Sequence, residues 1–148
     1  MDTPDNLKAF NYITLKIFDK LYEAFPEPIN ISGVRFVIEC VVDEGGDTEN
    51  TNNLHLLNDT VTWLEEEGFL TTKGQTMKGN IIHARLTLKG LTVLGYFPMS
   101  LDEKEDKTTI IEKTKEVLGK GIEDTSTEAV KNIVSSAFKL MAGYMVGV

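Results

Sequence analysis

The residues best suited to a defined chemistry are polar side chains on a helix-like segment. Asparagine and threonine can hydrogen-bond to base edges in the major groove of DNA, and histidine also offers a donor and an acceptor. The candidate base-contacting residues are Asn53, His55, Asn58 and Thr62. Their segment has no lysine or arginine, and Asp59 lies on the same side. These side chains suit recognition, and they fit the solvated face of a core helix equally well.

A second polar set follows in a glycine-containing loop over residues 73–80. Lysine neutralises phosphate charge, which supplies most non-specific affinity for DNA. Glutamine and threonine can add hydrogen bonds to phosphates or enter a neighbouring minor groove. The candidate phosphate-contacting residues are Lys73, Gln75, Thr76 and Lys78.

Few residues of the chain could catalyse a reaction. His55 and His83 are its only histidines, and Cys40 is its only cysteine. Cys40 lies in an apolar run, where a thiol is usually unreactive. The sequence lacks a phosphate-binding glycine loop, zinc-ligand spacing and a nucleophile elbow. We therefore expect no enzyme, no cofactor and no metal.

Residues 54–67 are predicted to form the helix that carries the first polar set. Apolar residues recur along it with the helical period, at Leu54, Leu57, Val61 and Leu64. Gly68 can adopt the left-handed conformation that ends a helix. The elements expected next are a strand at 69–72, the loop at 73–80, a strand at 81–87, and a helix at 88–94 capped by Thr87.

The preceding residues are predicted to complete a three-helix core. Residues 7–25 form a long apolar-faced helix, which Pro26 and Pro28 end. Residues 29–31 are expected to pair with the hairpin as a short strand. Ser32 is a plausible cap for a helix over 33–42, although its many β-branched residues leave a strand open for part of it. In this arrangement Leu57, Val61 and Leu64 pack against Ile13, Ile17 and Leu21, and the hairpin projects a cationic tip outward.

Residues 43–53 read as a polar, acidic loop between the second and third helices. The loop is longer than the tight turn of a compact helix-turn-helix, which disfavours ordinary major-groove docking. A calcium loop beginning at Asp43 would place Gly45 and Leu54 where oxygen ligands are needed. We therefore interpret the segment as a solvated loop.

Two runs resemble bacterial and phage-type winged helix-turn-helix proteins. They are Trp63-Leu64-Glu65-Glu66-Glu67-Gly68-Phe69-Leu70 and Leu86-Thr87-Leu88-Lys89-Gly90-Leu91. The resemblance covers roughly residues 7–97 and implies an α+β winged helix-turn-helix: a three-helix core with a small antiparallel β-hairpin wing. Residues 54–67 would then be the recognition helix and residues 73–80 the wing. Winged helices also serve as protein-interaction modules.

We expect a winged-helix domain over residues 1–100 and a C-terminal helical extension over residues 101–148. Helices are predicted from Thr108 or Thr109 to Gly119, and again after Thr125, which has capping-box spacing with Glu128. The last helix carries an apolar stripe, interpreted as an oligomerisation surface: Val130, Ile133, Val134, Ala137, Phe138 and Met141. The stripe could pack against another copy or the chain's own first helix, dock on a protein partner, or lie on a membrane surface.

The net charge of −8 disfavours a generic nucleic-acid binder. The charge is unevenly distributed, because residues 1–67 hold four basic and fourteen acidic side chains. Residues 68–100 hold four basic residues and no acidic one. The predicted wing is therefore a basic stretch in an acidic protein.

We expect a cytoplasmic protein that does not cross a membrane. The acidic N-terminus lacks the apolar core of a signal peptide, and no apolar run is long enough to span a bilayer. A single cysteine is consistent with a reducing compartment. The helix–wing order, the basic wing and the family resemblance predict a dimeric winged-helix regulator of transcription that binds double-stranded DNA. The alternative is an acidic winged-helix module that binds a protein partner and not DNA.

Overall fold

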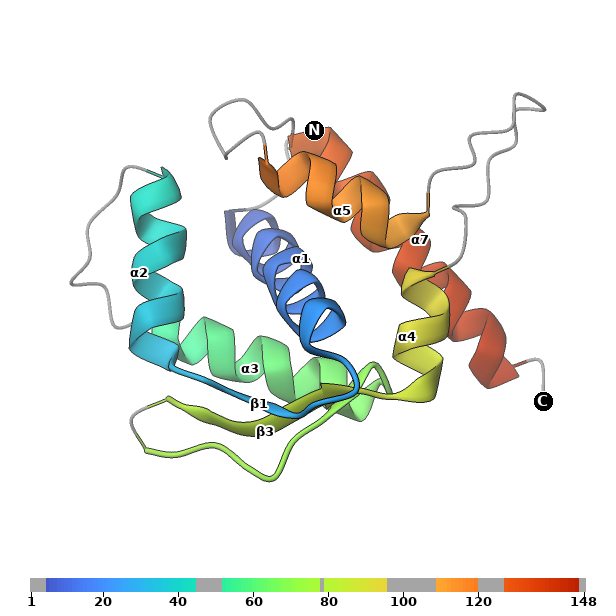
Figure 1. Ribbon diagram of the computed structural model, residues 1–148. Helices are drawn as coiled ribbons and strands as arrows, with labels where there is room; N and C mark the ends of the chain where they lie inside the picture. The colour runs from blue at the N-terminus through green and yellow to red at the C-terminus, as the bar shows by residue number, and fades with distance from the viewer. Residues whose placement is uncertain (1–4, 45–51, 78, 96–108, 120–126, 147–148) are drawn as a thin grey trace.

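The computed structural model describes residues 5–44, 52–77, 79–95, 109–119 and 127–146, which form an α+β fold (Figure 1). These residues contain six helices and a three-stranded antiparallel sheet. The helices are α1 (Asp5–Ala24), α2 (Gly33–Glu44), α3 (Asn52–Glu66), α4 (Leu88–Leu94), α5 (Ile110–Gly119) and α7 (Thr127–Val146). The strands are β1 (Ile29–Ile31), β2 (Leu70–Thr71) and β3 (Ile81–Leu86).

Helix α1 occupies the centre of the fold and contacts α3, α5, α7 and β3 (Figure 1). Leu15, Ile17 and Phe18 are fully buried along it, so this helix is apolar on more than one side. It ends shortly before Pro26 and Pro28, as predicted, because proline lacks the backbone N–H that a helix needs.

The predicted inward packing of the third helix is confirmed. Leu57, Val61 and Leu64 of α3 are at most 1% exposed, and α3 contacts α1 directly. They belong to the same hydrophobic cluster as Ile13, Ile17, and Leu21 of α1. This packing fixes which sides of α3 remain for any other contact.

The sheet has the strand order β1-β3-β2. The predicted pairing of residues 29–31 with the hairpin is confirmed, because Ile29 pairs with Ala84 and Ile31 with Ile81. Strand β2 is shorter than the predicted 69–72. Backbone hydrogen bonds continue the hairpin past it, with Lys73 N donating to Ile82 O at 2.8 Å and Ile82 N donating to Gly74 O at 3.0 Å. The left-handed φ of +116° at Gly74 interrupts the regular strand.

The second helix is confirmed and is longer than predicted. Ser32 precedes it, and the Ser32 hydroxyl accepts a hydrogen bond from Arg35 N at 3.4 Å. Asp43 and Glu44 continue α2 instead of beginning the predicted acidic loop. Asn52 and Asn53 already belong to α3. The remainder of that loop, including the calcium-loop position Gly45, lies outside the described residues.

Helices α5 and α7 confirm the predicted helical character of the C-terminal part. Helix α5 has a capping box, because Glu112 N donates to Thr109 Oγ1 at 3.2 Å and Thr109 N donates to Glu112 Oε1 at 3.5 Å. The predicted cap of the last helix at Thr125 lies outside the described residues. Both helices contact α1 and α4, and their buried residues join the same hydrophobic cluster as the sheet. The C-terminal helices therefore share one core with the N-terminal part.

Thr87 joins the end of the hairpin to α4. Its hydroxyl donates to Gly68 O at 2.6 Å and accepts from Gly90 N at 2.9 Å, so the predicted cap is confirmed. We expect Thr87→Ala to lower the free energy of unfolding by about 1–2 kcal/mol, since both bonds are lost. Thr87→Ser keeps the hydroxyl and should recover most of that loss. Chemical denaturation of both variants checks the cap, and equal losses would show that the methyl group matters instead.

Candidate nucleic-acid interface

The hairpin covers part of the helix face that was predicted to read bases. Gln75 extends from the hairpin to α3, where its Nε2 donates to Asn58 O at 3.3 Å and to Thr62 Oγ1 at 3.0 Å. The structure thus brings together a predicted phosphate-contacting residue, Gln75, and a predicted base-contacting residue, Thr62, but the two hydrogen-bond to each other. The Gln75 amide and the Thr62 hydroxyl are engaged within the chain.

A second contact holds the base of the hairpin against α3. The Glu65 carboxylate accepts a hydrogen bond from Thr72 N at 2.8 Å and further bonds from the Thr72 hydroxyl. A carboxylate that accepts a backbone N–H makes a charge-assisted bond, which is stronger than a neutral one. Two hairpin residues, Thr72 and Gln75, are therefore hydrogen-bonded to adjacent turns of α3, at Glu65 and Thr62.

Asn58 lies beneath the hairpin. A Cβ placed on Gly79 would lie 3.4 Å from Asn58 Nδ2 and 3.1 Å from Leu54 Cδ2, so the hairpin backbone packs directly on these two side chains. Asn58 Oδ1 is buried, without a hydrogen-bond partner among the described residues. In this conformation the Asn58 side-chain oxygen is not available to accept a hydrogen bond from a base.

One side of the hairpin turn contacts the start of α2, whereas Met77 in the turn is fully exposed. Asn80 Oδ1 accepts a hydrogen bond from Gly33 N, the first residue of α2, at 3.1 Å. A Cβ on Gly33 would lie 2.3 Å from Gly79 O, so the two backbones meet there. Thr76 is exposed, and its Oγ1 accepts from Asn80 N at 3.0 Å. Lys78, the tip cation, lies outside the described residues.

The part of α3 that remains exposed is acidic. His55, Asp59, Thr62 and Glu66 are exposed on one side of it, with two carboxylates and no lysine or arginine. Beside them Trp63 is 36% exposed. Its ring centroid lies 5.5 Å from that of Phe10 and 5.0 Å from that of Phe138. The helix backbone includes Asn53, whose side chain lies outside the described residues. A polyanion would meet repulsion along this strip.

The outer face of the sheet has the opposite charge. Thr71 of β2 pairs with Arg85 of β3, and their side chains are exposed, as are those of Lys73 and His83. These side chains surround a hollow of about 320 Å³, which we call the basic hollow. Its lining residues are Pro28, Thr71, Thr72, Lys73, His83 and Arg85. Among the described residues, the lining includes three basic side chains and no acidic one.

An irregularity in the sheet places His83 on this rim. His83 has a positive φ of 49°, and the register between β1 and β3 shifts at the same place. Non-glycine residues seldom adopt this conformation without compensation from their surroundings. Here the Asn30 side-chain oxygen accepts a hydrogen bond from His83 N at 2.9 Å. Arg85 lies two residues further along, and its Nη1 approaches Pro26 O at 3.5 Å.

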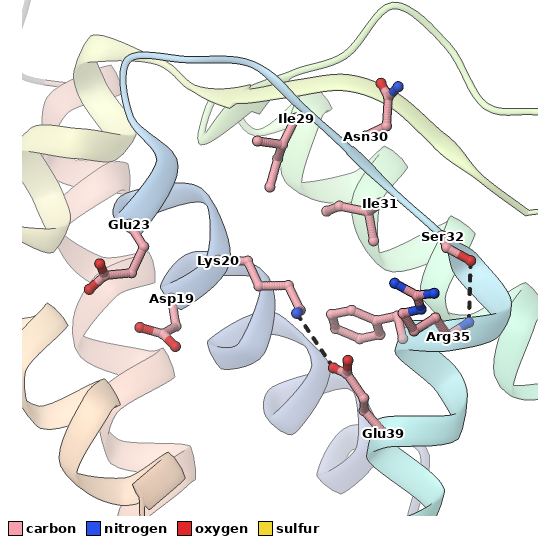
Figure 2. Close-up of a pocket in the computed structure, with 10 residues that line it drawn as sticks. Asp19, Lys20, Glu23, Ile29, Asn30, Ile31, Ser32, Arg35 and Glu39 are labelled. Carbon is pink, nitrogen blue, oxygen red and sulfur yellow. Dashed lines mark hydrogen bonds and ion pairs between the residues drawn. The ribbon is translucent and has the colours of Figure 1, made fainter.

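A larger hollow of about 510 Å³ lies between α1, β1 and α2 (Figure 2). Its charges are of both signs, and most of them are paired. Lys20 and Glu39 face each other across it at 3.4 Å, and Lys16 reaches the same carboxylate at 4.0 Å. On its α1 side, Asp19 accepts from Lys115 of α5 at 2.7 Å. These pairs leave less unbalanced charge here than in the basic hollow.

Lys115 also binds Glu23, and its two acidic partners connect α5 to α1. Burial lowers the pKa of Lys115, but hydrogen bonds to Asp19 and Glu23 outweigh it and raise the pKa overall. A raised lysine pKa stabilises the fold below the unfolded-state value of 10.5. The contribution is lost as the pH rises through the raised pKa.

The apolar stripe of α7 lies inside the chain. Val130, Ile133, Val134, Ala137 and Met141 are at most 7% exposed, and Phe138 packs partly buried against the same cluster. Helix α7 contacts α1, α4 and α5, so the expected packing against the chain's own first helix is confirmed. The proposed oligomerisation role is corrected accordingly, because these side chains leave little apolar surface for a second copy.

The outer sheet face contains functional candidates that the sequence pattern did not single out. Arg85 is one of the four basic residues of 68–100, to which the sequence alone assigns no individual role, and His83 enters only the catalytic inventory. The alternation Ala84, Arg85, Leu86 placed Arg85 on the outward face of a strand. The pairing that brings it opposite Thr71 could not be read from the sequence.

No family model matches the chain, and no curated protein or solved structure is significantly similar to it. Among the described helices, none combines the length and apolar character needed to span a bilayer. The described residues also contain no group of three or more potential metal-ligating side chains placed to hold an ion. The functional argument therefore depends on the surface geometry.

Proposed function

We propose that this chain is a winged-helix protein that binds duplex DNA through its hairpin and outer sheet face, and that it regulates transcription. The order α1, β1, α2, α3, β2, β3 is that of a winged helix and supports the proposal. The observation that carries it is the basic hollow, where Lys73, His83 and Arg85 gather on one exposed face of an acidic protein. The sequence predicts α3 as the helix that contacts bases, whereas the surface charges favour the outer sheet face as the DNA-binding surface.

Electrostatics explains this choice of face. Two unit charges about 4 Å apart interact by about 1 kcal/mol in water and by more near a protein surface. If α3 entered the major groove, Asp59 and Glu66 would approach phosphates and oppose binding. If the outer sheet face docked instead, Lys73 and Arg85 would replace counterions of the DNA backbone, which favours binding at low salt.

Binding to a fluorescent duplex, measured by polarisation over a salt series, tests the proposal. If Lys73 and Arg85 bind one phosphate in the basic hollow, log K falls with log salt concentration at a slope of about −1, since each phosphate contributes about −0.9. A second phosphate contacted by Lys78 would make the slope about −2. We expect His55→Ala, on the exposed strip of α3, to change the affinity less than about twofold. No polarisation change at about 50 mM salt, with a folded protein, would contradict DNA binding.

A protein-interaction module is the second candidate function, and the exposed strip of α3 favours it. The strip combines Asp59 and Glu66 with the exposed edge of Trp63, and aromatic residues are enriched in protein interfaces. The DNA titration discriminates between the candidates, because this alternative predicts no binding at any salt concentration. Sedimentation of the full chain tests the expected dimer, which would need a surface other than the α7 stripe.

A further inference from the structure

We infer that the basic hollow is a binding site for a single phosphate group, presented as a phosphate ester. Its volume of about 320 Å³ lies at the small end of the range for ligand sites, about 300–1,000 Å³. It has room for a phosphate with part of its sugar. The inference deepens the proposed function and rests on it for the source of the phosphate, which is the DNA backbone.

The lining offers donors and positive charge suited to a phosphate. The Arg85 guanidinium is a planar fork that can donate two parallel hydrogen bonds to phosphate oxygens. Lys73 adds a compact positive charge from the hairpin segment that follows β2, and the His83 ring adds a further N–H donor. Thr71, directly opposite Arg85, adds an exposed hydroxyl.

Thr72 has a different role, because its hydrogen-bonding capacity is already used. Its hydroxyl interacts with the Glu65 carboxylate and accepts from Gly74 N at 3.2 Å. Thr72 therefore fixes the course of the backbone between Thr71 and Lys73, which are both in the lining. Lys73 N is bonded to Ile82 O, so the two strands hold the site in one arrangement before a ligand arrives.

None of the described acidic residues lines the hollow. Glu27 precedes Pro28 in sequence but is absent from the lining, and Glu65 is bonded to Thr72. Among the described residues, the Arg85 guanidinium has one long hydrogen bond, to the Pro26 backbone oxygen at 3.5 Å. A phosphate in the hollow would therefore contact cationic side chains. None of the described lining residues supplies a carboxylate that would compete for them.

Amide chemical shifts of the ¹⁵N-labelled full chain test the inference. The chain is titrated with inorganic phosphate, with a deoxynucleoside monophosphate and with a short DNA duplex, each against sodium chloride of equal ionic strength. We expect Thr71, Lys73, His83 and Arg85 to shift with all three probes. Arg85→Ala should weaken duplex binding about tenfold, as the loss of a charged hydrogen bond predicts. The matched control is Lys139→Ala, which removes an exposed cation from α7.

The results with the small phosphates and with the duplex distinguish the phosphate site from DNA binding. Shifts in the hollow with phosphate, together with a loss of duplex affinity in Arg85→Ala but not in Lys139→Ala, support both. If the duplex binds but Arg85→Ala leaves its affinity unchanged, the phosphate site is overturned and DNA binding stands. If the duplex does not bind but the small phosphates shift the hollow, the site stands with a free phosphate ester as its ligand. If phosphate and monophosphate act no differently from chloride, the inference is overturned.

Discussion

Gly90→Ala is expected to lower the free energy of unfolding by about 3 kcal/mol, the upper part of the range for overpacking a close contact. A Cβ at Gly90 would lie 2.1 Å from Phe69 O and 3.0 Å from the Phe69 carbonyl carbon. Neither atom can move easily, because Phe69 O accepts a hydrogen bond from Thr87 N and the Phe69 side chain is only 1% exposed. Helix α4 would have to shift away from the hairpin.

Urea denaturation measures this effect, with Gly143→Ala as the matched control. Gly143 is also helical, but a Cβ there meets no atom within 4 Å. We expect Gly143→Ala to be neutral or to stabilise the chain by up to about 1 kcal/mol, because alanine favours helix. Equal effects of the two substitutions would show that α4 does not pack on Phe69 as described.

The double charge reversal Lys73→Glu with Arg85→Glu is expected to weaken duplex DNA binding by about a hundredfold or more. Each reversal removes a charged contact, worth about tenfold, and adds repulsion from the same phosphate. Both side chains are exposed, so the fold should tolerate the change. Fluorescence polarisation at low salt gives the affinities, and circular dichroism confirms that the variant is folded.

The matched control for this reversal is Lys131→Glu with Lys139→Glu. These two exposed lysines lie on α7, and their substitution changes the net charge by the same amount as the reversal in the hollow. If the basic hollow contacts the duplex, the control should lose no more than a few-fold in affinity through the weaker overall field. Similar losses in both double variants would mean that only net charge matters.

Local chemistry made much of the fold predictable. Gly68 has a positive φ of 91° at the end of α3, as expected for a residue free of a Cβ. Thr87 was predictable as a cap because its hydroxyl can accept a nearby backbone N–H. The apolar periods of α1 and α3 identified the side chains that meet in the core. Each of these signals involves residues close in sequence or a repeating pattern.

The candidate site was less predictable, because it depends on contacts between distant residues. The polar face of α3 was visible in the sequence, but not the fact that Gln75 would fold back on Thr62. The α7 stripe was visible too, but an apolar stripe has the same pattern whether its partner is the same chain or another. The basic hollow depends on the register that places Thr71 opposite Arg85.

The central claim is that duplex DNA contacts the outer sheet face and not α3. Hydrogen–deuterium exchange of the full chain, with and without a duplex of about two helical turns, tests it most directly. We predict slower exchange in residues 71–73 and 83–85 on binding, with no change in the exposed turns of α3 around His55 and Asp59. Protection of α3 with no change in the two sheet segments would contradict the account.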